Sequence, residues 1–155
     1  MKHKIDMNQV SRAQGSGYPA PFDEPCRERL RRRLGDAAGL TQFGVNLLTL
    51  PPGAWSSQRH WHTIEDEFVF VLDGEVVLVT DAGEDLLSAG DCAGFPAGAP
   101  DGHHLQNRSA RSATVLEVGT RRPADDEVFY SDIDMHAPKG DVGYAHRDGR
   151  PYPRK

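Results

Sequence analysis

Short apolar stretches separated by Gly, Pro and Asp constrain this chain more than any other feature of its sequence. Stretches of this kind, bounded by turn residues, predict β-strands. The predicted strands are Phe43–Leu50, Glu67–Leu72, Glu75–Thr80, Asp91–Phe95, His103–Asn107 and Thr114–Val118. The pair Asp73-Gly74 is typical of a tight hairpin turn between two of them. Because no long amphipathic helix accompanies these strands, the sequence predicts an all-β sandwich or barrel.

The composition divides the chain into three zones. Residues 1–40 are rich in Gly and Pro and are predicted to form an N-terminal arm, with a helical turn or two at Cys26–Leu34. Residues 41–120 contain the predicted strands and form the core domain. Residues 121–155 turn polar again and are predicted to be an extension that packs on the barrel or on a partner. At 155 residues the chain has the size of one domain.

The charge balance excludes several classes of protein. The chain carries 18 Lys and Arg against 23 Asp and Glu, whereas a nucleic-acid binder normally carries a basic stripe. No apolar run approaches the ~20 residues that span a bilayer, and Met1–Val10 lacks the apolar centre of a signal peptide. Two cysteines, Cys26 and Cys92, do not make a disulfide framework. We therefore expect a cytoplasmic protein with no nucleic-acid and no membrane partner.

The segment around His60-Trp61-His62 contains candidate metal ligands. Side chains alternate between the two faces of a strand, so both imidazoles point the same way. Glu67 begins the next apolar strand after a short turn, and a hairpin return can place its carboxylate beside them. Two imidazoles and one carboxylate on adjoining strands form a donor set that suits Fe(II) and similar ions. An all-thiolate site is excluded because Cys92 is the one cysteine in the core domain, where it is predicted to be a small buried hydrophobe.

A second segment supplies a further donor. Gly90-Asp91 makes a turn into a predicted strand, and Pro96-Ala97-Gly98 makes another turn. Either His103 or His104 then enters the next strand and adds an imidazole.

Together the two segments resemble the sequence motifs of the cupin superfamily. The first reads Gly53, six residues, His60-x-His62, four residues, Glu67, six residues and Gly74. The second reads Gly90, five residues, Pro96-x-Gly98, four residues, His103, three residues and Asn107. The first spacer is one residue longer than the family's pattern, and the gap before His103 is two residues longer. The layout of the whole chain resembles small single-domain bacterial cupins of unassigned function.

This resemblance implies a cupin jelly-roll β-barrel (a double-stranded β-helix) with N- and C-terminal arms, usually a homodimer, that holds one divalent metal ion. The implied ligands are His60, His62, Glu67 and His103. The spacing to Asn107 selects His103, but a bulge at Asp101-Gly102 would deliver His104 in its place. Two coordination positions would remain open, which suits Fe, Mn, Ni or Co, and Zn is also a candidate. No catalytic residue is assigned beyond the ligands.

Strand alternation also predicts what surrounds the ligands. Gln58 shares the inward face with His60 and His62, where it would line the pocket or hold a metal-bound water. Val69 and Val71 share the side of Glu67 and would make the interior apolar. No Lys or Arg is predicted to point inward, and the basic run of the arm would reach the mouth only by folding over it.

Two classes of function follow. A metal ion with open positions can polarise a carbonyl group or activate a water molecule. We therefore expect a metalloenzyme of the dioxygenase, isomerase or lyase type that acts on a small oxygen-rich metabolite. The alternative is a metal-containing protein that binds or senses a small molecule without turnover, because one fold can host many functions.

Overall fold

The computed structural model describes residues 3–155, which form a mostly β structure with one short α-helix and one 3-10 turn. The helical elements are η1 (Glu24–Cys26) and α1 (Leu34–Ala37). The strands are β1 (Ala13–Gln14), β2 (Leu30–Arg33), β3 (Phe43–Leu50), β4 (His60–His62), β5 (Glu67–Asp73), β6 (Glu75–Thr80), β7 (Gly83–Ser88), β8 (Cys92–Phe95), β9 (His104–Gln106), β10 (Ala113–Thr120), β11 (Val128–Tyr130) and β12 (His136–Ala137).

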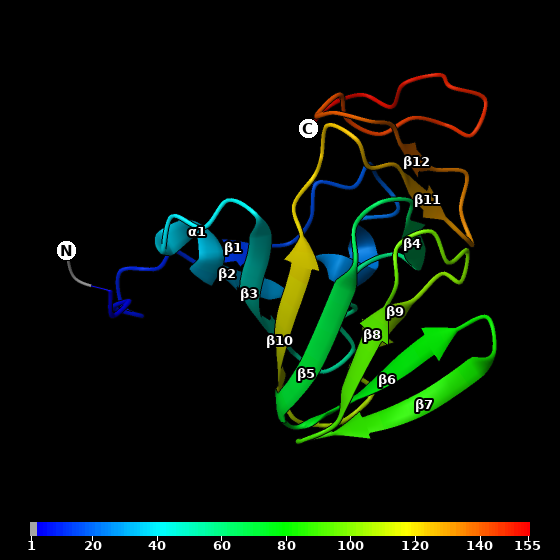
Figure 1. The fold of residues 1–155 in the computed structure, drawn as a ribbon. Coiled ribbons are helices and arrows are strands. Elements are labelled where there is room, and N and C mark those ends of the chain that lie inside the picture. Colours follow the sequence, from blue (N-terminus) through cyan, green and yellow to red (C-terminus); the bar gives the residue numbers. More distant parts are fainter. Residues whose placement is uncertain (1–2) are drawn as a thin grey trace.

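The strands are arranged in three antiparallel sheets (Figure 1). The largest has the order β1-β2-β3-β10-β5-β8, and the two smaller ones have the orders β12-β11-β4 and β7-β6-β9. The all-β prediction is thereby confirmed. The sheets are open, however, and hydrogen bonds between the described strands do not close them into one continuous barrel.

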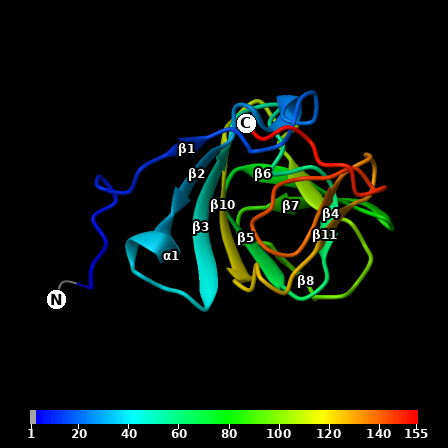
Figure 2. The ribbon, with the colours of Figure 1, turned by 90° about the horizontal axis from the view of Figure 1, so that it is seen from above.

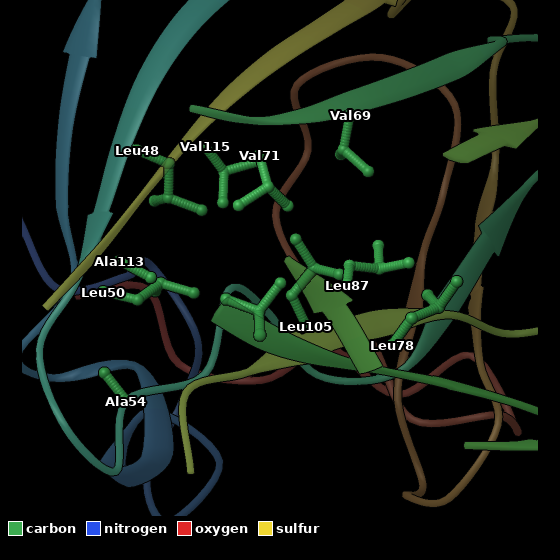
Figure 3. Packing of buried hydrophobic residues seen from close by; sticks show 11 residues of the cluster. Leu48, Leu50, Ala54, Val69, Val71, Leu78, Leu87, Leu105, Ala113 and Val115 are labelled. Atoms are coloured by element: carbon green, nitrogen blue, oxygen red, sulfur yellow. The ribbon is translucent and has the colours of Figure 1, made fainter. Parts of the chain in front are cut away.

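The main hydrophobic core lies between the largest sheet and the β7-β6-β9 sheet (Figure 3). Val71 of β5 is fully buried and Val69 nearly so, which confirms that they point inward. Leu48 of β3 and Val115 of β10 pack in the same cluster. Phe68, which alternates with Val69, is exposed on the other side of the sheet. The inward face that carries this core also carries Glu67.

The N-terminal segment joins the largest sheet through β2. Leu30–Arg33 pair with β3, so the predicted helical conformation of these residues is wrong. Helical turns form only before and after them, at η1 and α1. The free edge of β3 offers unpaired backbone groups, and pairing with it overrides the weak local preference of this segment. As a result, β2 contributes side chains to the inner face of the sheet.

The C-terminal segment joins the structure through β11, which pairs with both β4 and β12. A second buried cluster forms where the two terminal segments meet, and the ring of Tyr18 lies 5.6 Å from that of Tyr130 and 5.4 Å from that of Tyr144. Figure 2 shows the C-terminal segment, in orange and red, on the opposite side from β3. Trp61 stacks on Phe129 at 5.0 Å, so its outward ring is used in packing within the chain. The division of the chain at residues 40 and 120 stays a prediction.

The prediction that Cys92 is buried is wrong, because its side chain is exposed. It alternates with Ala93, which packs against the core, and therefore points to the outer face of the edge strand β8. Within residues 3–155, no helix has both the length and the apolar character that crossing a membrane requires.

Candidate metal centre

Four side chains from three parts of the chain meet at one place. His60 and His62 lie two residues apart on β4, and Glu67 is the first residue of β5. His103 comes just before β9, and its backbone exchanges two hydrogen bonds with His60, N to O at 3.2 Å and 2.9 Å. This bridge holds His103 next to the β4 strand, so the structure brings together all four residues of the favoured set.

The carboxylate of Glu67 is the centre of the cluster. Its Oε2 lies 2.6 Å from Nε2 of His103, 3.4 Å from Nε2 of His60 and 3.5 Å from Nε2 of His62. Ligand atoms of His60, His62 and Glu67 all lie within 4.8 Å of one another. When ligand atoms bind an octahedral ion at ~2.1 Å, two neighbouring ligand atoms are about 3 Å apart. The distances from Oε2 of Glu67 to the three imidazole nitrogens lie on both sides of this value. The donor set therefore fits a divalent ion.

The other ring nitrogens orient the first two imidazoles. Nδ1 of His60 donates to the carbonyl of Gln58 at 2.8 Å, and Nδ1 of His62 lies 2.6 Å from Oδ2 of Asp126. A ligating histidine normally uses its second nitrogen in this way, which fixes the ring and directs the free nitrogen at the metal. The ring of His103 stacks on Phe95 with centroids 3.6 Å apart. Both kinds of contact preorganise the site.

His104 points elsewhere. Its Nδ1 donates to the carbonyl of Ser57 at 2.8 Å, and its ring packs against Trp55 with centroids 4.7 Å apart. Burial lowers the pKa of His104 to about 4, so the imidazole is neutral. Of the two alternatives left open by the sequence, it is His103 that lies beside Glu67.

The electrostatics favour an anionic carboxylate among the rings. Burial alone would raise the pKa of Glu67, but the imidazoles around it hold that pKa well below its usual range. Burial alone would lower the pKa of His62, but the carboxylates of Glu67 and Asp126 raise it to about 9. Without metal, the cluster is therefore a negatively charged oxygen among imidazoles, and His62 must give up a proton to act as a ligand.

Asp126 is a candidate site residue that the sequence analysis missed. It is buried, and besides holding His62 it accepts a hydrogen bond from the backbone N–H of Ile64 at 2.8 Å. It could also form a second metal group with His62 and Glu65. Because its oxygens already serve the His62 ring and the backbone, we interpret Asp126 as a positioning residue. It lies in a polar stretch of the C-terminal segment where no local pattern marks it.

Replacing Asp126 with Asn should weaken metal binding by about 10- to 100-fold, the usual effect of losing a carboxylate that orients a ligating histidine. The amide keeps the shape of the side chain but loses the charge that faces Nδ1 of His62. Metal titration against a competing chelator measures the effect. Asp125→Asn, one residue away and exposed, is the control. Equal affinities in both variants would contradict the positioning role.

The cluster lies in a cavity of about 450 Å³ that opens between the largest sheet and the β12-β11-β4 sheet. Its charged lining residues besides the histidines are Arg29, Arg31, Arg121, Glu65, Glu67 and Glu117. The expectation that no arginine points inward is therefore wrong. The basic run reaches the cavity because β2 adds to the sheet, so that Arg31 shares the inner face with Glu117.

Gln58 does not take the place expected for it. Its side-chain amide donates to the carbonyl of Phe22 at 2.8 Å and fastens the N-terminal segment. The short stretch before β4 is not extended, so the strict alternation that placed Gln58 beside the histidines does not apply there.

The chain is similar in sequence and structure to known proteins. Residues 46–119 match the family model described as a cupin domain. A structure from Silicibacter pomeroyi, described as a sugar phosphate isomerase from a cupin superfamily, is 48% identical, with a TM-score of 0.90. The match covers 97% of this chain and 96% of that one. No protein among the curated sequences matches.

More distant structures show the same fold. A putative sugar phosphate isomerase from Acidithiobacillus ferrooxidans is 26% identical with a TM-score of 0.78, over 99% of this chain and 98% of that one. The polyketide cyclase of Streptomyces resistomycificus is 19% identical with a TM-score of 0.62, over 77% of this chain and 80% of that one. The second of these supports the fold alone.

Proposed function

This chain belongs to the cupin superfamily, and from that premise we propose that it is a divalent-metal-dependent isomerase of a small phosphorylated sugar. The observation that carries the proposal is the cavity, in which a cluster of metal-ligand type shares the walls with arginines. The description of the 48% identical structure as a sugar phosphate isomerase supports it.

In this proposal His60, His62, Glu67 and His103 hold one divalent ion, of Fe, Mn, Ni, Co or Zn. Such an ion acts as a Lewis acid that polarises the carbonyl and neighbouring hydroxyl oxygens of a sugar. Asp126 keeps the ring of His62 in its orientation, and Phe95 does the same for His103 by stacking. The chain thus supplies a rigid set of donors on strands, which positions a substrate better than loops would.

The charge of the cavity suits an anionic substrate. The arginines and glutamates that line it are equal in number, so their formal charges balance once the histidines are neutral as metal ligands. A bound divalent ion would leave a net positive charge that the adjacent Asp126 reduces without cancelling, and an anionic substrate would neutralise the remainder. Charge balance therefore favours a phosphomonoester over a neutral sugar.

Two phenols in the cavity would contact substrate oxygens. The ring of Tyr130 lies 5.9 Å from that of His60, and Tyr144 packs next to it. Burial raises the pKa of Tyr130 well above its usual value, so its O–H stays protonated. A protonated phenol donates hydrogen bonds to substrate oxygens and does not repel a phosphate.

The proposal is tested with purified protein loaded in turn with each candidate ion. Each sample is incubated with aldose and ketose phosphates of three to six carbons in D₂O and followed by NMR. We expect metal-dependent interconversion of one such pair, with or without deuterium from solvent depending on how hydrogen moves between the carbons. Tight retention of an unchanged sugar phosphate with every ion would contradict the isomerase and support the binding or sensor protein. The homodimer expected from the sequence stays a prediction.

A further inference from the structure

We propose that Arg29 and Arg31, together with the hydroxyls of Tyr18 and Tyr144, form a subsite for a phosphate dianion in the cavity. This inference rests on the proposed function and names the part of the chain that would recognise its substrate. The subsite comes from the terminal segments and β2, whereas the metal cluster comes from β4, β5 and the residue before β9.

Arg29 is the first reason for expecting an anion. Its side chain is buried, with 8% of the residue exposed, and it lines the cavity. It donates from Nε to the carbonyl of Gly15 at 2.9 Å and from Nη1 to the carbonyl of Ser56. Within residues 3–155 no carboxylate lies within ion-pair distance of it. A buried guanidinium without a counter-charge is costly, and an anionic ligand would supply that charge.

Arg31 adds a second guanidinium to the lining of the same cavity. It forms a two-pronged ion pair with Glu117, Nε to Oε2 at 3.0 Å and Nη2 to Oε1 at 3.2 Å. Burial, and after it the charge of Arg31, lowers the pKa of Arg29. Arg29 and Arg31 carry two positive charges, and Glu117 balances one of them. This part of the cavity therefore has a net charge of one positive unit.

The tyrosines complete the subsite. Tyr18 and Tyr144 line the same cavity, and the charge of Arg29 affects the pKa of both phenols. Burial raises both pKa values, so each O–H remains a donor at neutral pH. The hydroxyl of Tyr18 accepts a hydrogen bond from the backbone N–H of Gln58 at 3.3 Å, which leaves its proton to donate. Guanidinium and hydroxyl donors together are the usual partners of phosphate oxygens.

The strand register places Glu117, the partner of Arg31, near the metal cluster. Glu117 of β10 lies opposite Val69 of β5, two residues from Glu67 on the same face. Diagonal neighbours of this kind are roughly 7–8 Å apart. Because Arg31 is paired with Glu117, its guanidinium lies over the same face of the sheet as Glu67. A phosphate on Arg31 would leave the other end of the sugar at the histidines.

The test is calorimetric titration with inorganic phosphate, and with glycerol phosphate against glycerol, none of which an isomerase can turn over. Each titration uses metal-free and metal-loaded protein. Arg31→Gln removes the charge at nearly constant shape, and the double variant Arg31→Gln with Glu117→Gln avoids leaving a buried carboxylate unpaired. Arg32→Gln is the matched control, because it lies on the same strand, points to the other face and does not line the cavity.

We expect phosphate and glycerol phosphate to bind the parent and Arg32→Gln alike, with and without metal, and glycerol not to bind. Arg31→Gln and the double variant should bind phosphate at least about tenfold more weakly, with unchanged metal content. Phosphate affinity equal to that of the parent in both Arg31 variants, or seen only when metal is bound, would overturn the subsite. Binding without any sugar turnover would leave the subsite standing and refute the isomerase, so the two failures are distinguishable.

Discussion

Replacing His60 or His62 with Ala is expected to lower the affinity for a divalent ion by at least about 100-fold. Each residue would supply one of four donors, and losing a ligand should cost at least as much as losing a group that only orients one, which costs 10- to 100-fold. Metal content after dialysis against a weak chelator, measured by elemental analysis, gives the effect. A variant that keeps the metal content of the parent would contradict its assignment as a ligand.

His103 and His104 provide a matched pair within the same prediction. His103→Ala should lose metal as His60→Ala does, because the Nε2 of His103 lies 2.6 Å from Glu67. His104→Ala should keep its metal, because the ring of His104 is engaged by Ser57 and Trp55. Both histidines are buried and adjacent in sequence, so a general loss of folding would affect both variants. The reverse outcome would show that His104 is the ligand.

Replacing Asn107 with Ala is expected to lower the free energy of unfolding by roughly 2–4 kcal/mol. Asn107 is fully buried, and its amide donates to the carbonyls of Leu50 and Arg111 at 2.7 Å each. Its Oδ1 also accepts from the backbone N–H of Ser109 at 2.9 Å. Alanine would leave the buried carbonyl of Leu50 without this partner and would remove two part-buried hydrogen bonds. Urea unfolding of metal-free protein measures the change.

The Asn107 substitution also distinguishes an effect on folding stability from an effect on metal binding. Its metal affinity at a temperature where the variant is folded should match that of the parent, since no ligand has been touched. His60→Ala, in contrast, removes a ligand and should lower the metal content greatly. An unfolding midpoint of Asn107→Ala equal to that of the parent would contradict the structural role.

The long strands could be predicted from sequence because their apolar residues and turn signals are local. The six predicted strands lie within a residue or two of β3, β5, β6, β8, β9 and β10. Strand β7 was missed because Gly83, Glu84 and Asp85 give its first half the composition of a turn. It pairs with β6 all the same, since the hairpin at Thr80 brings it alongside.

The donor cluster could be predicted in outline but not in every member. His60 and His62 follow from strand alternation alone. The choice between His103 and His104 could not be made in that way, because a shift of one residue sends a side chain to the opposite face. The backbone of His60 pairs with that of His103, 43 residues later in the sequence, and this pairing sets the register. Such long-range pairing leaves no local pattern.

Other parts of the cavity depend on contacts between distant segments. Asp126 reaches His62 from the C-terminal segment, and Arg29 and Arg31 reach the cavity from the N-terminal one. Their sequence surroundings are those of polar surface loops. Only the pairing of β2 with β3 and of β11 with β4 turns them toward the interior.

Anomalous diffraction from crystals grown with Mn²⁺ or Co²⁺ is the most direct test of the central claim, that one metal ion binds among these donors. The account predicts a single strong peak at about 2.0–2.3 Å from Nε2 of His60, His62 and His103 and from a carboxylate oxygen of Glu67. A peak between Nδ1 of His62, Glu65 and Asp126, or no peak within the cavity at saturating metal, would contradict it.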